Sequence, residues 1–269
     1  MMAAALPVIR SIIERGDARV ELLAQGSGPP VVMIPSLGRP AQDFDDLSRR
    51  LADAGYRALR PQPRGIGGSA GPMTGITLHD FARDVAAVIG KNGGEPAVVA
   101  GHAFGNFVAR ATAADFPALV RAVVLLGATH VWPLPPEVRA SINRTHDMRL
   151  PEAERIRCMQ HAFFAPGNDP RVWLDGWHEE VMLAERAATE ATPREEWWHA
   201  GTAPILDVQP AHDVMTPPGS RNRYRDELGA HRVTMTLIPR AGHALLPEQP
   251  QAVAEAILAY LKQLGSRDS

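Results

Sequence analysis

Cysteine is almost missing from this chain, since Cys158 is the only one among 269 residues. A single thiol cannot form an internal disulfide, and it does not suggest a metal cluster. We interpret Cys158 as a small, buried, apolar side chain. The sequence therefore excludes a fold that is held together by its own disulfides.

An excess of charge of either sign is also missing. The chain has 28 Lys and Arg residues against 30 Asp and Glu residues, which gives a formal net charge of -2. Such a balance produces no long-range field that would attract nucleic acid or an anionic membrane surface. We therefore expect a small neutral or weakly polar ligand, and neither a nucleic acid nor a membrane as partner.

Long apolar runs are missing as well. No segment approaches the length of a membrane span, and the start of the chain lacks the basic region and apolar run of a secretory signal. The composition, with 45% apolar and 22% charged residues, is typical of a soluble globular protein. These features predict a cytoplasmic protein.

Short apolar runs are what the chain does have. An alternating pattern over 8–13 and 20–23, on either side of Gly16-Asp17, predicts a hairpin. Continuous runs typical of strands covered on both faces follow at 31–34, 97–100, 122–126, 205–208 and 233–238, with a weaker one at 56–59. Helical spacing lies between them over 78–88 and 104–111, and a last helical pattern follows over 253–264. This alternation predicts an α/β fold with a doubly wound, mostly parallel sheet.

One segment interrupts the alternation. Residues 130–200 are rich in helix formers, carry no strand-like run and contain all five tryptophans of the chain. We interpret this segment as a helical cap that is inserted between two parts of one α/β core, residues 1–129 and 201–269.

The most specific motif is Gly101-His102-Ala103-Phe104-Gly105, where a buried strand turns sharply into an amphipathic helix. The turn needs glycines beside its apex because neighbouring backbone comes too close for a Cβ. The segment closely resembles the nucleophile elbow of the α/β-hydrolase family, which usually reads Gly-His-Ser-x-Gly. Ala103 stands at the serine position.

Further motifs extend this resemblance over nearly the whole chain. Residues 35–38 (Pro-Ser-Leu-Gly) follow a strand where the family often has His-Gly-x-x, and residues 64–69 (Arg-Gly-Ile-Gly-Gly-Ser) look like its Arg-Gly-x-Gly-x-Ser loop. Asp213 follows a strand, and His243 precedes the last helix. Serine position, acid and histidine thus occur in the order of the family.

The resemblance implies a role for each of these residues. His243 would be the general base, and Asp213 would fix its tautomer. The backbone N–H groups of Phe104 and Leu37 would form the oxyanion hole, although Pro35-Ser36 departs from the usual His-Gly before Leu37. No metal or organic cofactor is implied.

Other interpretations compete with these roles. Asp207 is a second candidate for the acid, but its place inside a strand favours a structural role. His102 and His212 are interpreted as neighbours that fill space, and Glu248 as a carboxylate at a helix entry. Residues 65–70 match a dinucleotide-binding pattern only formally, since no helix starts directly after them. A metal site of Asp207, His212 and Asp213 lacks a supporting ligand motif.

Ala103 has two explanations. Either a serine was replaced deliberately to inactivate the enzyme, or the chain is a naturally inactive relative that binds a ligand. The presence of both His243 and Asp213 favours the first explanation. An aspartate nucleophile at position 103, as in the related dehalogenases and epoxide hydrolases, agrees less well with the preceding Gly-His, which is more common before serine. In either case the chain with Ala103 is expected to bind substrate and barely turn it over.

The cap offers aromatic side chains for a substrate pocket. The candidate pocket residues are Trp132, Phe163, Phe164, Trp173, Trp177, Trp197 and Trp198. Such a lining favours a bulky apolar or aromatic small molecule. Esters and lactones are the substrates that the resemblance implies first, with amide or carbon–carbon cleavage and a hydrolase-fold receptor as alternatives. The oligomeric state stays open.

Overall fold

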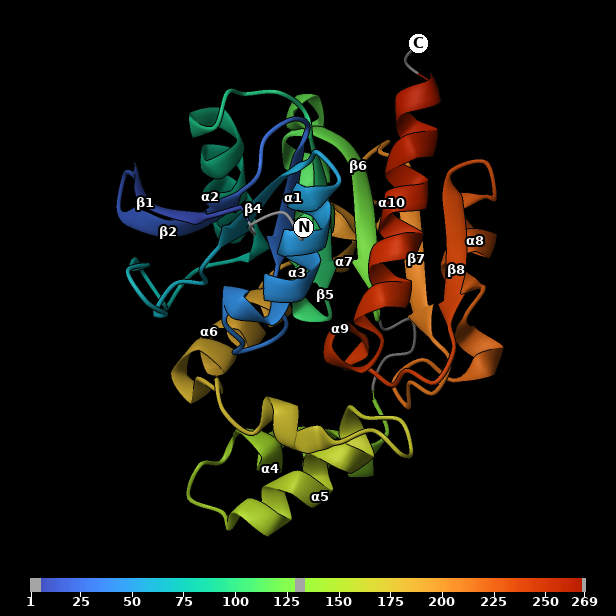
Figure 1. Ribbon diagram of the computed structural model, residues 1–269. Coiled ribbons are helices and arrows are strands. Elements are labelled where there is room, and N and C mark those ends of the chain that lie inside the picture. Colours follow the sequence, from blue (N-terminus) through green and yellow to red (C-terminus); the bar gives the residue numbers. More distant parts are fainter. Residues whose placement is uncertain (1–5, 129–133, 268–269) are drawn as a thin grey trace.

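The computed structural model describes residues 6–128 and 134–267. Within these residues one eight-stranded sheet is covered by helices on both faces (Figure 1). The strands are β1 (Val8–Arg15), β2 (Ala18–Gln25), β3 (Pro30–Ile34), β4 (Arg57–Pro61), β5 (Ala97–His102), β6 (Val120–Leu126), β7 (Ile205–Pro210) and β8 (Val233–Ile238).

The sheet has the order β1-β2-β4-β3-β5-β6-β7-β8. β2 pairs antiparallel with β1 and β4, and every other neighbouring pair is parallel. This confirms the predicted mostly parallel sheet with its opening hairpin. The chain moves from β3 to β4 on one side and then to β5 on the other. Loops at the carboxyl ends of β3 and β5 therefore face a crevice at this switch in direction.

Helices fill the connections between the strands. They are α1 (Asp45–Asp53), α2 (Leu78–Lys91), α3 (Phe104–Asp115), α4 (Pro136–His146), α5 (Glu152–Ala162), α6 (Glu179–Glu190), α7 (Arg194–Trp197), α8 (Arg223–Leu228), α9 (Leu245–Glu248) and α10 (Pro250–Arg267). Short 3-10 helices cover Ala41–Phe44, Pro117–Leu119, Pro170–Trp173 and Pro218–Ser220. In the described ranges, no helix combines the length and apolar character that crossing a bilayer requires.

Two core clusters lie on opposite faces of the sheet. Successive side chains of a strand point to opposite faces, so Val98 and Val99 of β5 belong to different clusters. Val98 packs with α1 and α10, for example with Leu51, whereas Val99 packs with α2 and α3, for example with Phe81. Burial on both faces explains why these strands are continuous apolar runs in the sequence.

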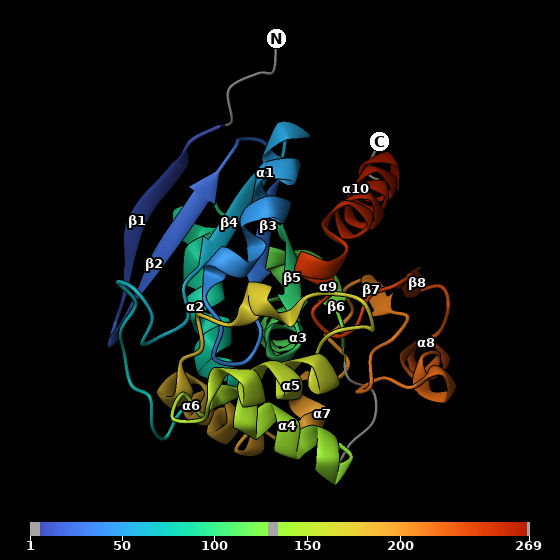
Figure 2. The same cartoon turned by 60° about the horizontal axis from the view of Figure 1, so that its bottom comes forward.

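The segment between β6 and β7 forms helices α4 to α7, and residues 134–200 contain no strand. Figure 2 shows α4, α5 and α6 gathered beside the carboxyl edge of the sheet. Side chains of α4 and α5 join the 3-10 helix Pro170–Trp173 in a third apolar cluster. Ala188 near the end of α6 and Trp197 at the end of α7 instead belong to the core cluster around α3. The second half of the predicted cap thus packs on the core. The limits of the cap at 130 and 200 are our interpretation of the sequence.

Candidate active site

Ala103 forms the apex of a tight turn between β5 and α3. Its backbone has φ 49° and ψ −110°, a conformation that costs a residue with a Cβ free energy. A Cβ on Gly101 would lie 2.1 Å from the carbonyl O of Gly105, and one on Gly105 would lie 2.2 Å from that of Ile34. Only glycine fits beside the apex, as the motif predicts.

His243 and Asp213 meet beside this turn, although 30 residues separate them in the chain. The Nδ1 atom of His243 lies 2.9 Å from Oδ2 of Asp213, and both side chains are buried. The other carboxylate oxygen of Asp213 accepts the backbone N–H of Met215 at 2.8 Å. The carboxylate therefore fixes the imidazole with its Nδ1–H, and His243 lines the same cavity as Ala103.

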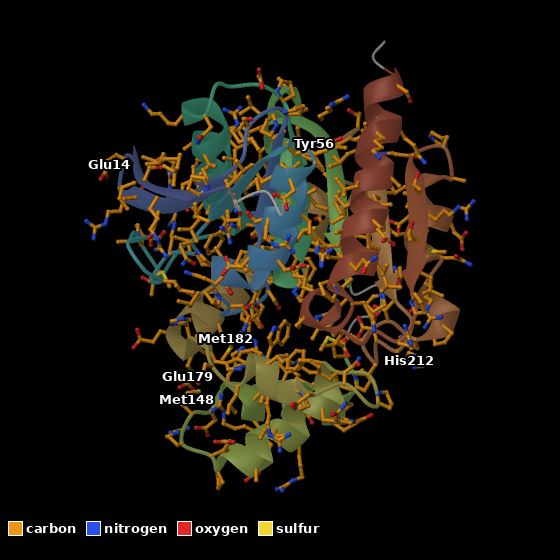
Figure 3. The ribbon with its side chains drawn as sticks, viewed as in Figure 1. Glu14, Tyr56, Met148, Glu179, Met182 and His212 are labelled. Carbon is orange, nitrogen blue, oxygen red and sulfur yellow. The ribbon has the colours of Figure 1, made fainter. Side chains whose placement is uncertain are left out.

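Asp207, the alternative acid, lies within β7. Its Oδ2 atom accepts a hydrogen bond from Nε2 of Gln209 at 2.8 Å, inside the same strand. The geometry therefore favours Asp213 as the partner of His243. His212 has an exposed side chain in the loop after β7, at the lower end of the β7–β8 region in Figure 3.

His102 does more than fill space. Its Nε2–H donates to the backbone carbonyl of His243 at 2.8 Å. Burial, together with the nearby charge of His243, lowers the pKa of His102 to about 3, so the ring is neutral and acts as a donor at this atom. It also packs against Trp173, with 5.8 Å between ring centroids. His102 thus anchors the loop that carries His243.

Glu248 lies within α9 and bridges two loops, which differs from the helix-entry role expected for it. Its Oε2 atom accepts the N–H of Gly242 at 2.6 Å, and its Oε1 atom accepts the N–H of Ala165 at 2.7 Å and Nδ2 of Asn168 at 2.6 Å. Burial raises the pKa of Glu248, and these hydrogen bonds oppose the shift. The carboxylate fastens the loop before His243 to the cap.

The expected oxyanion donors flank Ala103. Phe104 begins α3, so its N–H is one of the unpaired groups at the helix N-terminus, and Leu37 belongs to the loop after β3. Both residues line the cavity together with Ala103. The structure therefore brings together the elbow, the His243–Asp213 pair and both expected donor residues.

The cap holds the loop after β3 through Gly38, by contacts that we call the Gly38 clamp. The N–H of Gly38 donates to Oε2 of Glu185 on α6 at 2.7 Å, and the carbonyl O of Gly38 accepts the N–H of His178 at 3.0 Å. Burial raises the pKa of Glu185 to about 8, whereas the hydrogen bond from Gly38 opposes this shift. Nothing in the sequence pattern distinguishes Glu185 from an ordinary helix-surface carboxylate.

The cavity between core and cap has an empty volume of about 920 Å³, its open mouth included. Residues of α4 and α6 line it on the side of the cap, and residues of α3 line it on the side of the core. Its lining residues are Ser36, Leu37, Ala103, Phe104, Phe107, Leu134, Arg139, Ile142, His146, Phe163, Trp177, Arg186, Thr189, Glu190, Met215 and His243. Most of this lining is apolar, with polar side chains at the cap end.

The aromatic residues of the cap divide between the cavity and the packing around it. Of the expected pocket residues, Phe163 and Trp177 line the cavity. Phe164 and Trp173 pack within the cap cluster, and Trp132 lies outside the described residues.

Trp197 and Trp198 lie in the core cluster around α3 and do not line the cavity. The buried guanidinium of Arg110 stacks on both indoles, with 4.8 Å and 4.6 Å to the ring centroids. Among the expected pocket residues that the structure describes, Phe163 and Trp177 are therefore the two that line the cavity. The interpretation of Cys158 also changes, because its side chain is only partly buried.

Two further motifs have structural explanations. In the loop that formally matches a dinucleotide pattern, Arg64 forms a buried ion pair with Asp84 at 2.7 Å, and the next α-helix, α2, begins only at Leu78. Thr77 and Asp80 form a capping box at the start of α2. Within the described residues no three His, Cys, Asp or Glu side chains are grouped to hold a metal ion.

Comparisons with known proteins agree with this fold. The model of the Alpha/beta hydrolase family matches residues 31–256. A 2-(acetamidomethylene)succinate hydrolase of Mesorhizobium japonicum is 30% identical over 117 residues, which cover 44% of this chain and 42% of that protein.

Two solved structures illustrate how widely the fold is shared. An esterase from Exiguobacterium antarcticum superposes with a TM-score of 0.78 at 20% identity and covers 94% of this chain and 100% of its own. A thermophilic esterase from Thermogutta terrifontis gives 0.75 at 20% identity and covers 96% and 99%.

Proposed function

The chain belongs to the alpha/beta hydrolase family, and from this premise we propose that its cavity binds an ester or lactone of a bulky apolar or aromatic molecule. Hydrolysis at this site requires serine at position 103. With Ala103 the cavity binds the same molecule and leaves it almost unchanged. Neither form needs a metal or an organic cofactor for this chemistry.

The single observation that carries this proposal is that the His243–Asp213 pair and a strained turn meet at one cavity. His243 is fixed by Asp213 at 2.9 Å and shares the cavity with Ala103. The turn keeps its costly backbone conformation with an alanine that cannot react. A site for binding alone needs neither feature, which also favours the view that Ala103 replaces a serine.

The chemistry follows from these positions. A serine hydroxyl at position 103 attacks the ester carbonyl while His243 takes its proton, and Asp213 stabilises the resulting imidazolium. The N–H groups of Phe104 and Leu37 stabilise the oxyanion. His243 then returns the proton to the leaving alcohol, and a water molecule that it activates hydrolyses the acyl-enzyme. The methyl group of Ala103 has no lone pair, so the first step cannot occur.

A ligand-binding protein is the second candidate function. Ala103 itself supports it, because the chain has the cavity and no nucleophile. Amide and carbon–carbon cleavage would use the same residues on other substrates. The name of the Mesorhizobium japonicum relative includes an acetamido group, which supports testing amides beside esters.

The test is Ala103→Ser, assayed with a panel of aromatic esters, lactones and amides. We expect the serine variant to hydrolyse at least one ester or lactone. Its kcat should exceed that of the alanine chain by a factor on the order of 10⁶. The matched control is the double variant Ala103→Ser/His243→Ala, which has the nucleophile without its base. A folded Ala103→Ser protein that neither hydrolyses the panel nor reacts with a serine-directed phosphonate would leave the binding function in its place.

A further inference from the structure

Two arginines line the end of the cavity that is formed by the cap. Arg139 lies on α4 and Arg186 on α6, and both line the cavity that also contains Ala103 and His243. The two helices meet here, since Nη1 of Arg186 donates to Oδ1 of Asn143 on α4 at 2.7 Å. The balanced composition of the chain predicts a neutral ligand and gives no sign of these charges.

Neither guanidinium has an ion pair within the part of the chain that the structure describes. Arg186 is half-buried, and Asn143, which accepts its hydrogen bond, is neutral. Burial lowers the pKa of Arg186, the positive charge of Arg139 lowers it further, and Glu190 opposes the shift. Arg139 is exposed, and its charge lies close enough to act on the half-buried Arg186.

Other arginines near the cap and the core have a carboxylate partner. Arg39 pairs with Asp43 at 2.7 Å, and Arg64 pairs with Asp84 at 2.7 Å. Those carboxylates compensate the charge within the fold. At the cavity, Arg139 and Arg186 have no such partner, which leaves guanidinium donors available to an anion.

The net charge at this end of the cavity indicates which anion fits. Arg139, Arg186 and Glu190 together leave one positive charge among the residues that line it. His146 adds none at neutral pH, because burial lowers its pKa to about 4. A single positive charge matches a monoanion, and the planar guanidinium fork matches a carboxylate.

We propose that Arg139 and Arg186 bind a carboxylate of the substrate at the cap end of the cavity. This inference rests on the proposed function for the position of the reacting bond, which lies at Ala103. The apolar lining between the two ends includes Ile142, Phe163 and Trp177. The substrate class is thus an apolar or aromatic molecule that carries a carboxylate at one end and the scissile carbonyl toward the other.

The experiment measures binding to the chain as it stands, with Ala103 in place, by isothermal titration calorimetry. The probes are phenylhexanoate, its neutral isostere phenylhexanamide, and phenylhexyl phosphate. We expect the carboxylate to bind about tenfold or more tightly than the amide, as a charge-assisted hydrogen bond provides. We expect the phosphate dianion to bind more weakly than the carboxylate, because only one positive charge is uncompensated.

Variants assign the effect to these residues. Arg186→Gln and Arg139→Gln should each weaken binding of the carboxylate about tenfold and leave the amide unchanged. Arg157→Gln, an exposed arginine of α5 outside the cavity lining, is the matched control and should change neither. Glu190→Gln should strengthen carboxylate binding several-fold. Arg186→Lys keeps the charge if the glutamine variant fails to fold, and should retain the preference for the carboxylate.

Several outcomes would overturn the inference. They are equal affinity for carboxylate and amide, no saturable binding of the carboxylate, tighter binding of the phosphate, or a loss in Arg186→Gln that affects both probes alike. Because these measurements need no nucleophile, they are separate from the test of hydrolysis. Carboxylate preference in a protein whose Ala103→Ser variant is inert would support this inference and contradict the proposed enzyme.

Discussion

At the scale of the residue, the backbone of Ala103 is strained, although its methyl group cannot act as a nucleophile. Its φ of 49° suits glycine better than alanine. We expect Ala103→Gly to raise the free energy of unfolding by up to about 1 kcal/mol, because glycine adopts this conformation without a clash. Urea unfolding measures the change.

The control for this prediction is the same substitution at an unstrained position. Ala187 is exposed on α6, so Ala187→Gly should lower the free energy of unfolding by about 0.5 to 1 kcal/mol. The two substitutions should therefore have opposite signs. Equal destabilisation by both would mean that position 103 is not strained.

The assignment of His243 and Asp213 is tested in the Ala103→Ser background. His243→Ala should remove nearly all turnover, and Asp213→Asn should lower kcat by about 10⁴, because the amide cannot fix the required tautomer. Asp207→Asn, within the preceding strand β7, is the matched control and should leave most activity. Steady-state kinetics on folded variants measure all three, and a larger loss from Asp207→Asn would make Asp207 the acid.

At the scale of the element, the Gly38 clamp joins α6 to the loop after β3 through a buried acid. The pKa of Glu185 is about 8 in the fold, against a usual value of 4.5. Between these values the folded chain keeps the proton while the unfolded chain has lost it. The native state then binds more protons, so this residue makes the free energy of unfolding fall as pH rises from about 4.5 to 8.

Glu185→Gln should remove this dependence and keep an acceptor for the N–H of Gly38. We expect the variant to gain stability over the parent as pH rises from 5 to 8, by up to about 1.4 kcal/mol per pH unit. Denaturant unfolding at both pH values measures the gap. Glu180→Gln, an exposed change on the same helix, should show no such gap, and a constant difference for Glu185→Gln would contradict the role of its ionisation.

The two groups of cap tryptophans should differ in function, one responding to the ligand and the other stabilising the fold. Trp177 lines the cavity, whereas Trp198 packs against Arg110 and Tyr224. Trp177→Phe should remove most of the fluorescence change on binding an aryl ester, and Trp198→Phe should retain it. Trp198→Ala should instead lower the free energy of unfolding by about 3 to 5 kcal/mol, the usual cost of emptying a buried aromatic site.

Fluorescence titration and urea unfolding of the same variants check both parts of this prediction. Met148 provides a control on the cap surface, where its side chain lies at the outer edge of the cap (Figure 3). Met148→Ala should change neither signal. Loss of the ligand response in Trp198→Phe alone would place the binding site near α3 and α7.

At the scale of the whole molecule, the sequence predicts the features that depend on local pattern or chain order. Buried strands covered on both faces leave continuous apolar runs, so the apolar pattern by itself predicts the parallel sheet. The elbow is predicted because its apex and the two glycines beside it are close together in the chain. His243 and Asp213 are found because each closes a recognisable strand–loop–helix unit of the family.

The features that the sequence does not predict come from contacts between distant segments. Glu185 meets Gly38 across 147 residues, and its neighbours on α6 give no sign of its burial. Trp177 and Trp197 belong to one tryptophan-rich segment, yet they end in different clusters, because α7 packs on α3 whereas α4 and α5 form the cap cluster. Arg139 and Arg186 become neighbours only when α4 and α6 fold together.

The Gly38 clamp also constrains how a ligand can enter. Gly38 is held by His178 and Glu185, which belong to the same segment that roofs the cavity. A cap that swings away to admit a molecule must break these bonds and release the loop that positions Leu37. Ligand entry and a complete oxyanion hole would then exclude each other in time. The N–H of Leu37 would reach its position only after the cap has closed over the bound ligand.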